Sequence, residues 1–461
     1  MRNMQVTRRS FLGGATALAV GTAFGAAESG AYERADGRAT DSVLVRRLYL
    51  DLAGRLPTIE EAKAFVDAEN QRTGASVVPG GRDKLAELVD RLLASDDFVD
   101  YWSMRFADVL RVKSEFPINL WPNAVYVYHR RIRAFVRSGE SWADFARALL
   151  MGKGSDFRDA EANFYRATAK RTPEGFAEIA AQTFLGENWR SVARLEELTP
   201  YFANIRVKHT REWKEEVVVI DGEDRRGEFA DRLTGEWRDA FVAALTSRLR
   251  YWLLGEKVVG GSCLVTTNHS LKEFIRQIVL SDDYARGPVA GGFRCRRLDA
   301  EVLDDAICSL TGMKRDYQSI APEPFTFLPP DRRTVAIEDG SITNGFLLLF
   351  GRPARDSGLL AERQNAITAK QRLYLFNSGK LFNALNCFSK NRPKKQTMSV
   401  LVDDLYWRFY SRPPTATEHA ALMGHFRSLP TGKGKNGRAR WAFPRDVAWA
   451  LLNSREFLYQ H

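Results

Sequence analysis

The sequence has few of the residues and short motifs that typically mark a metal centre or an active site. Its 461 residues include six histidines and four cysteines, and none of them stands in a His-Glu-x-x-His or Cys-x-x-Cys spacing. It also lacks a Gly-x-Ser-x-Gly elbow and a phosphate-binding P-loop. We therefore expect no metal site and no cofactor, and we find no nucleophile with an adjacent base.

Long apolar runs are also scarce. Beyond the N-terminal region no segment reaches about 18 consecutive apolar residues, so we expect no transmembrane span in the mature chain. Residues 7–27, "TRRSFLGGATALAVGTAFGAA", place Arg8 and Arg9 before a mildly apolar segment that ends in small residues near Ala27. This pattern is typical of a twin-arginine signal. It predicts that residues 1–27 are a signal peptide and that the mature protein is periplasmic or extracellular.

Positive charge is in excess. The formal net charge is +11, and removing Arg2, Arg8 and Arg9 with the signal leaves 11 − 3 = +8. A basic surface favours anions, so we expect an anionic ligand, such as an acidic glycan, or a protein partner. The basic residues are spread along the chain and match no nucleic-acid-binding motif, so nucleic acid is not expected.

The cysteines leave their pairing open. An exported chain with Cys263, Cys295, Cys308 and Cys387 allows up to two disulfides. A protein that folds before export can equally keep four separate buried thiols.

Hydrophobic periodicity predicts a mainly α fold. Residues 82–98, "RDKLAELVDRLLASDDF", carry apolar side chains at helical spacing, and several later segments do the same. Residues 215–224, "EEVVVIDGED", favour a strand, and a short hairpin is expected around residues 329–333. We predict a multi-helix orthogonal bundle with a small β insert.

Both ends of the chain contain the same pattern. "LYLDLAGRLPTIEE" at residues 48–61 corresponds to "LYWRFYSRPPTATE" at residues 405–418. Each copy is followed by a related segment, "LLASDDF" or "LLNSREF". We interpret this as a repeated two-helix module. The matching residues are Leu48, Tyr49, Arg55, Pro57, Thr58 and Glu61 with Leu405, Tyr406, Arg412, Pro414, Thr415 and Glu418.

Packing explains the residues that the modules share. Proline ends the first helix, and Thr58 or Thr415 can cap the next one with a glutamate three residues later, as in a capping box. The alternative is that each module binds a ligand through Arg55 or Arg412.

Long motifs resemble a known pair of families. "RRLYLDLAGRLPTIEEAKAFVD" and "FARALLMGKGSDFRDAEANFYRA" resemble the PSCyt domain of planctomycete exported proteins. "RLDAEVLDDAICSLTG", "FGRPARDSGLLAERQN" and "ALLNSREFLYQH" resemble its usual companion, the PSD domain. The resemblance implies helical domains at residues 40–215 and 235–461 and an exported protein, often linked to cytochromes, whose biochemical function is not established.

The chain departs from that pattern twice. Many relatives carry Cys-x-x-Cys-His after "AQTFLG", whereas residues 187–202, "ENWRSVARLEELTPYF", contain no cysteine or histidine. Covalent c-type haem at this position is therefore excluded. A longer loop and a helix of the relatives are reduced to "GGSCLVTTNHS", which makes any site that they build doubtful here.

The strongest candidate site is "FGRPARDSGLLAERQN", residues 350–365. Arg352, Arg355 and Arg363 are predicted to gather near a helix start that Asn365 or Thr368 caps, an environment that favours an anion. Asp356 and Glu362 are weak candidates for the acid and base of a hydrolase. The first expectation is an internal network in which these acids pair with these arginines, and anion binding is the second.

The second candidate is "SEFPINLWPNAVYVYHRRIR", residues 114–133. A tryptophan with amide and acidic neighbours is typical of a sugar-binding surface. The alternative is a buried anchor, with Asn123 as a helix cap. The candidate binding residues are Glu115, Asn119, Trp121, Asn123 and His129.

Three functional hypotheses follow. The leading one is a non-catalytic binding or scaffold protein of the cell envelope that binds an acidic glycan or a partner protein. The second is a hydrolase of acidic or sulfated polysaccharide. The third is an electron-transfer-associated protein that has lost its haem motif.

Overall fold

The structure is a computed structural model that describes residues 32–68, 83–255, 270–287, 293–321, 328–329, 331–390, 396–432 and 435–461. The predicted signal peptide with Arg8 and Arg9, the shortened loop and Cys263 lie outside the described residues. Cys308 is a buried free thiol, and Cys295 and Cys387 are exposed free thiols.

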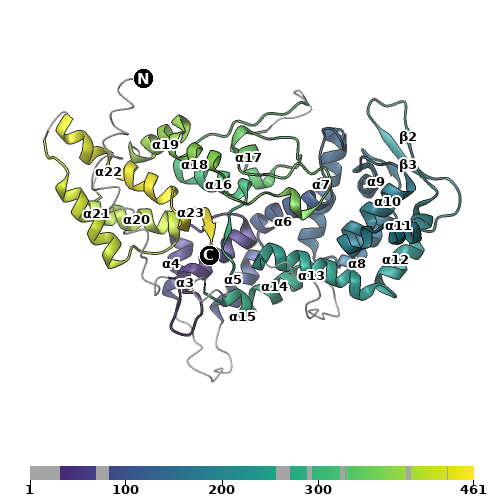
Figure 1. Ribbon diagram of the computed structural model, residues 1–461, viewed down its shortest axis with the longest axis horizontal. Coiled ribbons are helices and arrows are strands. Elements are labelled where there is room, and N and C mark those ends of the chain that lie inside the picture. Colours follow the sequence, from purple (N-terminus) through teal and green to yellow (C-terminus); the bar gives the residue numbers. More distant parts are fainter. Residues whose placement is uncertain are drawn as a thin grey trace.

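The described chain is mainly helical (Figure 1), which confirms the predicted fold class. Within that part of the chain, no helix is both long enough and apolar enough to cross a membrane. The first half contains α3 (Asp41–Leu48), α4 (Ile59–Asp67), α5 (Lys84–Leu93), α6 (Asp96–Val109), α7 (Pro122–Ser138), α8 (Trp142–Leu150), α9 (Asn163–Arg166), α10 (Pro173–Ala180), α11 (Val192–Leu198), α12 (Arg226–Thr234) and α13 (Arg238–Leu254).

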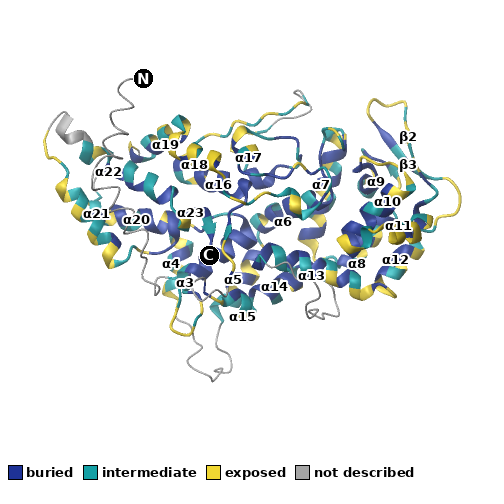
Figure 2. Cartoon of the chain, in the orientation of Figure 1, coloured by how far each residue is buried: buried dark blue, intermediate teal, exposed yellow. Residues whose placement is uncertain are grey.

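The second half continues the helical pattern. Its helices are α14 (Leu271–Val279), α15 (Asp282–Ala285), α16 (Ala300–Thr311), α17 (Gly345–Leu349), α18 (Ala369–Asn377), α19 (Gly379–Lys390), α20 (Met398–Tyr410), α21 (Ala416–Ser428), α22 (Lys435–Leu452) and α23 (Arg455–Leu458). Buried side chains run through helices of both halves, and they form one hydrophobic cluster that extends from Ala39 to Leu458 (Figure 2).

The β insert is small, as predicted, and its strands are antiparallel. β3 (Glu216–Ile220) lies between β2 (Ile205–His209) and the short β1 (Gly154–Ser155), with Val207 opposite Val218. Figure 1 shows the β2–β3 hairpin projecting at one end of the molecule. A second sheet pairs β4 (Arg296–Arg297) with β5 (Tyr459–Gln460), so the last residues of the chain lie against the start of the α16 region.

The structure describes only part of the segment in which the sequence predicts a hairpin around residues 329–333, and the prediction of its second strand is wrong. Thr334–Ala336 forms a 3₁₀ turn. The carboxylate of Asp305 accepts hydrogen bonds from the backbone N–H groups of Thr334 and Val335, at 2.7 and 3.2 Å. Because a side chain binds these N–H groups, they are not available to a strand partner.

The repeated modules have the same local structure. Thr58 and Thr415 each cap their helix in a capping box. Arg55 binds Glu61 (2.7 Å) and Asp97 (2.6 Å). Arg412 makes the equivalent ion pairs with Glu418 (2.8 Å) and with Glu456, at 2.7 Å. The module arginines therefore join the helix start to the following segment, as the packing interpretation requires.

The two modules lie side by side (Figure 1), although more than 350 residues separate them in sequence. Arg46 of α3 is buried and donates hydrogen bonds to the carbonyl oxygens of Phe409 (2.8 Å) and Phe457 (3.1 Å). The N-terminal helices thus pack on the C-terminal module and close the chain on itself.

The difference in burial predicts that the two module arginines contribute unequally to the free energy of unfolding. The side chains of Arg412 and Glu418 are 4% and 3% exposed, whereas those of Arg55 and Glu61 are 28% and 29% exposed. Because Arg412→Ala leaves buried carboxylates unpaired, we expect it to lower the free energy of unfolding by about 3–5 kcal/mol. Arg55→Ala, whose partners stay partly hydrated, should cost about 1 kcal/mol. Urea unfolding of both variants measures this, and equal costs would contradict it.

Candidate functional site

Residues 350–365 form a strap that crosses α6 and α16 between α17 and α18. The strap needs two glycines with positive φ, Gly351 at 80° and Gly358 at 72°. A Cβ on Gly351 would lie 2.1 Å from the carbonyl oxygen of Gln364, and one on Gly358 would lie 2.4 Å from that of Val109. The strap can therefore approach its neighbours only because these residues have no side chain.

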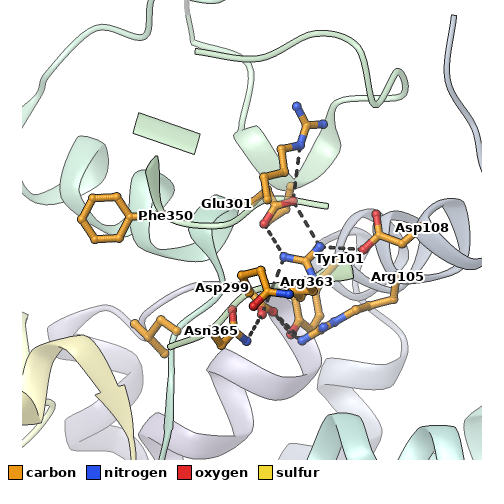
Figure 3. A network of polar contacts seen from close by, with 12 residues as sticks. Tyr101, Arg105, Asp108, Asp299, Glu301, Phe350, Arg363 and Asn365 are labelled. Atoms are coloured by element: carbon orange, nitrogen blue, oxygen red, sulfur yellow. Dashed lines mark hydrogen bonds and ion pairs between the residues drawn. The ribbon is translucent and has the colours of Figure 1, made fainter. Parts of the chain in front are cut away.

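An ion-pair network fixes the strap to the helices (Figure 3). Asp108, near the end of α6, accepts from Arg355 Nε at 2.8 Å and from Arg363 Nη2 at 2.6 Å. Arg363 Nη1 also contacts Glu301 of α16 at 2.6 Å. Arg352 lies 3.4 Å from Glu301 and donates to the carbonyl oxygen of Ile342. The three predicted arginines thus meet carboxylates from other elements rather than the start of α18, which Thr368 caps.

Asp299, the residue just before α16, extends the network. Its carboxylate pairs with Arg105 of α6, and Asn365 Nδ2 donates to it at 2.9 Å. The phenol of Tyr101 accepts from Arg105 Nη2 at 2.7 Å. The strap, α6 and α16 are therefore joined through charged groups that are largely excluded from water (Figure 3).

The network keeps its carboxylates ionised. Burial alone would raise the pKa of Asp299, but Arg105 and Arg363 hold that pKa well below its usual range. Arg363 and Arg355 likewise lower the pKa of Asp108 against the effect of burial. Neither acid is protonated near neutral pH, so neither is suited to act as a general acid.

The two weak catalytic candidates have structural partners. Asp356 is 41% exposed and binds Lys113 Nζ at 2.5 Å. Glu362 accepts hydrogen bonds from the backbone N–H groups of Asp356, at 3.2 Å, and Ser357, and so closes a turn of the strap. Neither residue lines the cavity described next.

A cavity of about 730 Å³ opens beside the network, and its lining is basic. Five arginines line it, against two aspartates, Asp108 and Asp299. We call it the arginine cavity. The aromatic side chains of Tyr251, Trp252 and Tyr459 are also part of its wall. The arginines are Arg105, Arg294, Arg296, Arg297 and Arg363.

These arginines differ in how many of their hydrogen-bond donors are already bound to groups of the protein. Arg297 donates to several backbone carbonyl oxygens, among them that of Gln364 at 2.8 Å. Arg296 binds Asp51 at 2.5 Å. Arg294 is exposed, and its hydrogen bond to Gly255 O is long, at 3.4 Å. Within the described residues, no carboxylate lies within 4 Å of Arg294 or Arg297, so neither of these two arginines is paired with a described acid.

Sequence reasoning identified two cavity residues, Arg363 and Asn365, and missed the other four arginines. The available signal was the cluster "RCRR" at residues 294–297, within a stretch that appeared only irregular. Arg105 lies in an amphipathic helix, where a single arginine carries no distinguishing signal.

The residues of the second predicted site lie in different environments. His129 is buried, and burial together with Arg355 and Arg133 lowers its pKa well below the usual value. Trp121 is the residue immediately before α7. Asn119 and Asn123 are exposed. Glu115 is half-buried, and its backbone N–H donates to Ser341 Oγ at 2.9 Å.

Comparison with known families places two domains in tandem. A family model described as PSCyt2, a protein of unknown function (DUF1549), matches residues 32–208. A second, PSD1, also a protein of unknown function (DUF1553), matches residues 262–426. These matches confirm the resemblance seen in the motifs. No curated protein and no solved structure matches the chain.

The network predicts a specific acid dependence. Because the pKa of Asp299 is lower in the folded than in the unfolded protein, its ionised form stabilises the fold above its unfolded pKa. We expect Asp299→Asn to lower the free energy of unfolding by about 3 kcal/mol at pH 7. That difference should stay constant down to about pH 5. It should shrink below about pH 4, where the Asp299 carboxyl of the unfolded wild-type protein takes up a proton.

Urea unfolding of both proteins at a series of pH values measures the difference. Asp282→Asn is the matched control, because Asp282 also pairs with an arginine but is 83% exposed. It should have little effect at any pH. A difference for Asp299→Asn that grows on acidification would be incompatible with an ionised, arginine-bound Asp299.

Proposed function

Since the chain is a tandem of a PSCyt2 and a PSD1 domain, both of unknown function, we propose its role from its geometry: it binds an acidic ligand in the arginine cavity. The cavity is lined by residues from both halves of the chain, among them Arg105 and Tyr251 from the first half and Arg294 and Arg363 from the second. A ligand bound there would contact both domains.

The unneutralised charge of the lining carries this proposal. Arg105, Arg296 and Arg363 are paired with carboxylates, so the excess charge of the lining is that of the other two arginines, Arg294 and Arg297. The cavity volume, about 730 Å³, lies in the usual range for small-molecule sites. Arginine binds carboxylate, sulfate and phosphate groups through two parallel hydrogen bonds. Arg294 is the arginine best placed to do so, because it is exposed and bound to the protein only weakly.

Arg105 offers a second set of donors. Only its Nη2 hydrogen-bonds to described residues, namely to Tyr101 and Asp299, which leaves Nε and Nη1 for a ligand. Asp299 and Asp108 remain ionised beside it and can accept hydrogen bonds from hydroxyl groups. This combination supports a ligand that has both acidic and hydroxyl groups.

An acidic glycan meets these requirements, and it agrees with a role as a binding or scaffold protein of the cell envelope. The wall of the cavity also contains Tyr251, Trp252 and Tyr459, whose flat rings can pack against a sugar. We do not propose hydrolysis, because Asp356 binds Lys113 and Glu362 closes a turn, both outside the cavity lining.

Arg294→Ala tests the proposal. With a sulfated disaccharide as the probe, we expect isothermal titration calorimetry to show about tenfold weaker binding for the variant, since a charged hydrogen bond contributes about 1.5–3 kcal/mol. Wild-type binding should weaken as salt is raised. Removing this exposed side chain should leave the thermal midpoint unchanged.

Arg427→Ala is the matched control, because Arg427 is also exposed but lies on α21, away from the cavity lining. It should bind the disaccharide like the wild type. Equal affinities of wild type and Arg294→Ala, or wild-type binding that salt does not affect, would rule out the arginine cavity as the site.

A further inference from the structure

We propose that the chain has a second binding site, for the sugar rings of a glycan chain, on an aromatic surface formed by the half-buried Trp121 and the exposed Trp213 and Lys214. We call it the aromatic platform. It lies where the loop before α7 meets the turn of the β2–β3 hairpin, and none of its residues lines the arginine cavity. The inference therefore stands independently of the proposed function.

The hairpin turn holds Trp213 out toward solvent. Two backbone hydrogen bonds close the turn, from Thr210 N to Glu215 O and from Glu215 N to Glu212 O, both at 3.3 Å. Lys214 has a positive φ of 66°. The side chain of Trp213 remains 63% exposed, which is unusual for so large an apolar group.

The two indole rings form a preorganised pair. The ring centroids of Trp121 and Trp213 lie 4.7 Å apart with an angle of 69° between the planes, an edge-to-face arrangement. Lys214 Nζ lies 5.8 Å from the centroid of each ring. A ring already held in place loses little conformational freedom on binding a ligand.

The segment around Trp121 adds exposed groups on both sides. Phe116, five residues earlier, is 80% exposed, and Tyr126, five residues later, is 57% exposed. Asn119 and Asn123 are exposed as well. Asn123, Tyr126 and Arg130 follow one another at the spacing of one α7 face, and all three are exposed. Exposed aromatic and amide side chains thus flank Trp121 in the sequence.

A glycan fits this chemistry better than a lipid bilayer. The face of a sugar ring that carries only C–H groups packs on a flat aromatic ring, and the amides of Asn119 and Asn123 can bind its hydroxyl groups. Lys214 provides a positive charge for an acidic substituent. A peripheral membrane anchor instead buries the apolar face of an amphipathic helix in the bilayer, whereas Trp121 and Trp213 lie in a loop and in a hairpin turn. Here the hairpin turn also carries Glu212, which pairs with Arg158 at 2.7 Å.

Affinity gel electrophoresis with polygalacturonate in the gel tests the platform. We expect the acidic polysaccharide to retard the wild-type protein and Trp213→Ala to weaken that binding about tenfold, the loss expected for one aromatic stacking contact. Trp213→Phe, which keeps a flat ring, should retain most of the affinity. If Trp213→Phe keeps its affinity, the weaker binding of Trp213→Ala is due to loss of the aromatic ring and not to a changed hairpin.

Trp441→Ala is the matched control. Trp441 is another exposed tryptophan, at 49%, with a lysine, Lys390, 6.0 Å above its ring, but it lies on α22. It should migrate like the wild type. Equal retardation of wild type and Trp213→Ala would overturn the proposal. It would also be overturned if polygalacturonate did not retard the wild type and if the wild type, unlike Trp213→Ala, bound anionic lipid vesicles.

The two sites can be told apart. Trp213→Ala should still bind the sulfated disaccharide with wild-type affinity, because that probe reports on the arginine cavity. If Arg294→Ala weakens disaccharide binding and Trp213→Ala weakens only the retardation, both sites exist. A Trp213→Ala variant that loses both would contradict a separate platform.

Discussion

The contact of Arg363 with Asp108 and Glu301 is the interaction on which the centre of the molecule depends. It joins three elements that are distant in sequence, α6, α16 and the strap, through distances of 2.6 Å on both sides. Taking these charges out of water is costly, and only pairing makes it tolerable. The strap cannot move without exposing or unpairing them, so the wall that it contributes to the arginine cavity is rigid.

That rigidity has a consequence for binding. Arg105 and Arg363 are oriented by Asp299, Asp108 and Glu301 before any ligand arrives, so little freedom is lost when a ligand binds. The same acids neutralise the arginines that they orient, so the excess positive charge of the lining is that of Arg294 and Arg297, which have no described carboxylate within 4 Å. An ion-pair network and an anion site are therefore compatible here, because the network positions the arginines and the excess supplies the charge.

Sequence patterns were sufficient for the helices, the β insert and the modules. Thr58 and Thr415 behave as their spacing indicated, because a helix cap acts over a few residues. The partners of Arg352, Arg355 and Arg363 could not be deduced, since Asp108 and Glu301 lie far away in the chain. Sequence reasoning paired these arginines with Asp356 and Glu362, the nearest acids. Trp213 was missed for the same reason: its neighbour Trp121 is 92 residues away.

Arginines in similar sequence contexts thus have opposite roles, and burial with charge balance separates them. Arg412 is almost fully buried between Glu418 and Glu456, so its charge is neutralised within the protein. Arg294 follows a glycine-rich stretch and ends at the cavity with no described carboxylate within 4 Å. Because a net charge of +11 must be distributed over the surface, such unneutralised positions are where anions concentrate. The arginines that hold the fold and those that face a ligand are therefore distinguished by their partners, which only the three-dimensional arrangement determines.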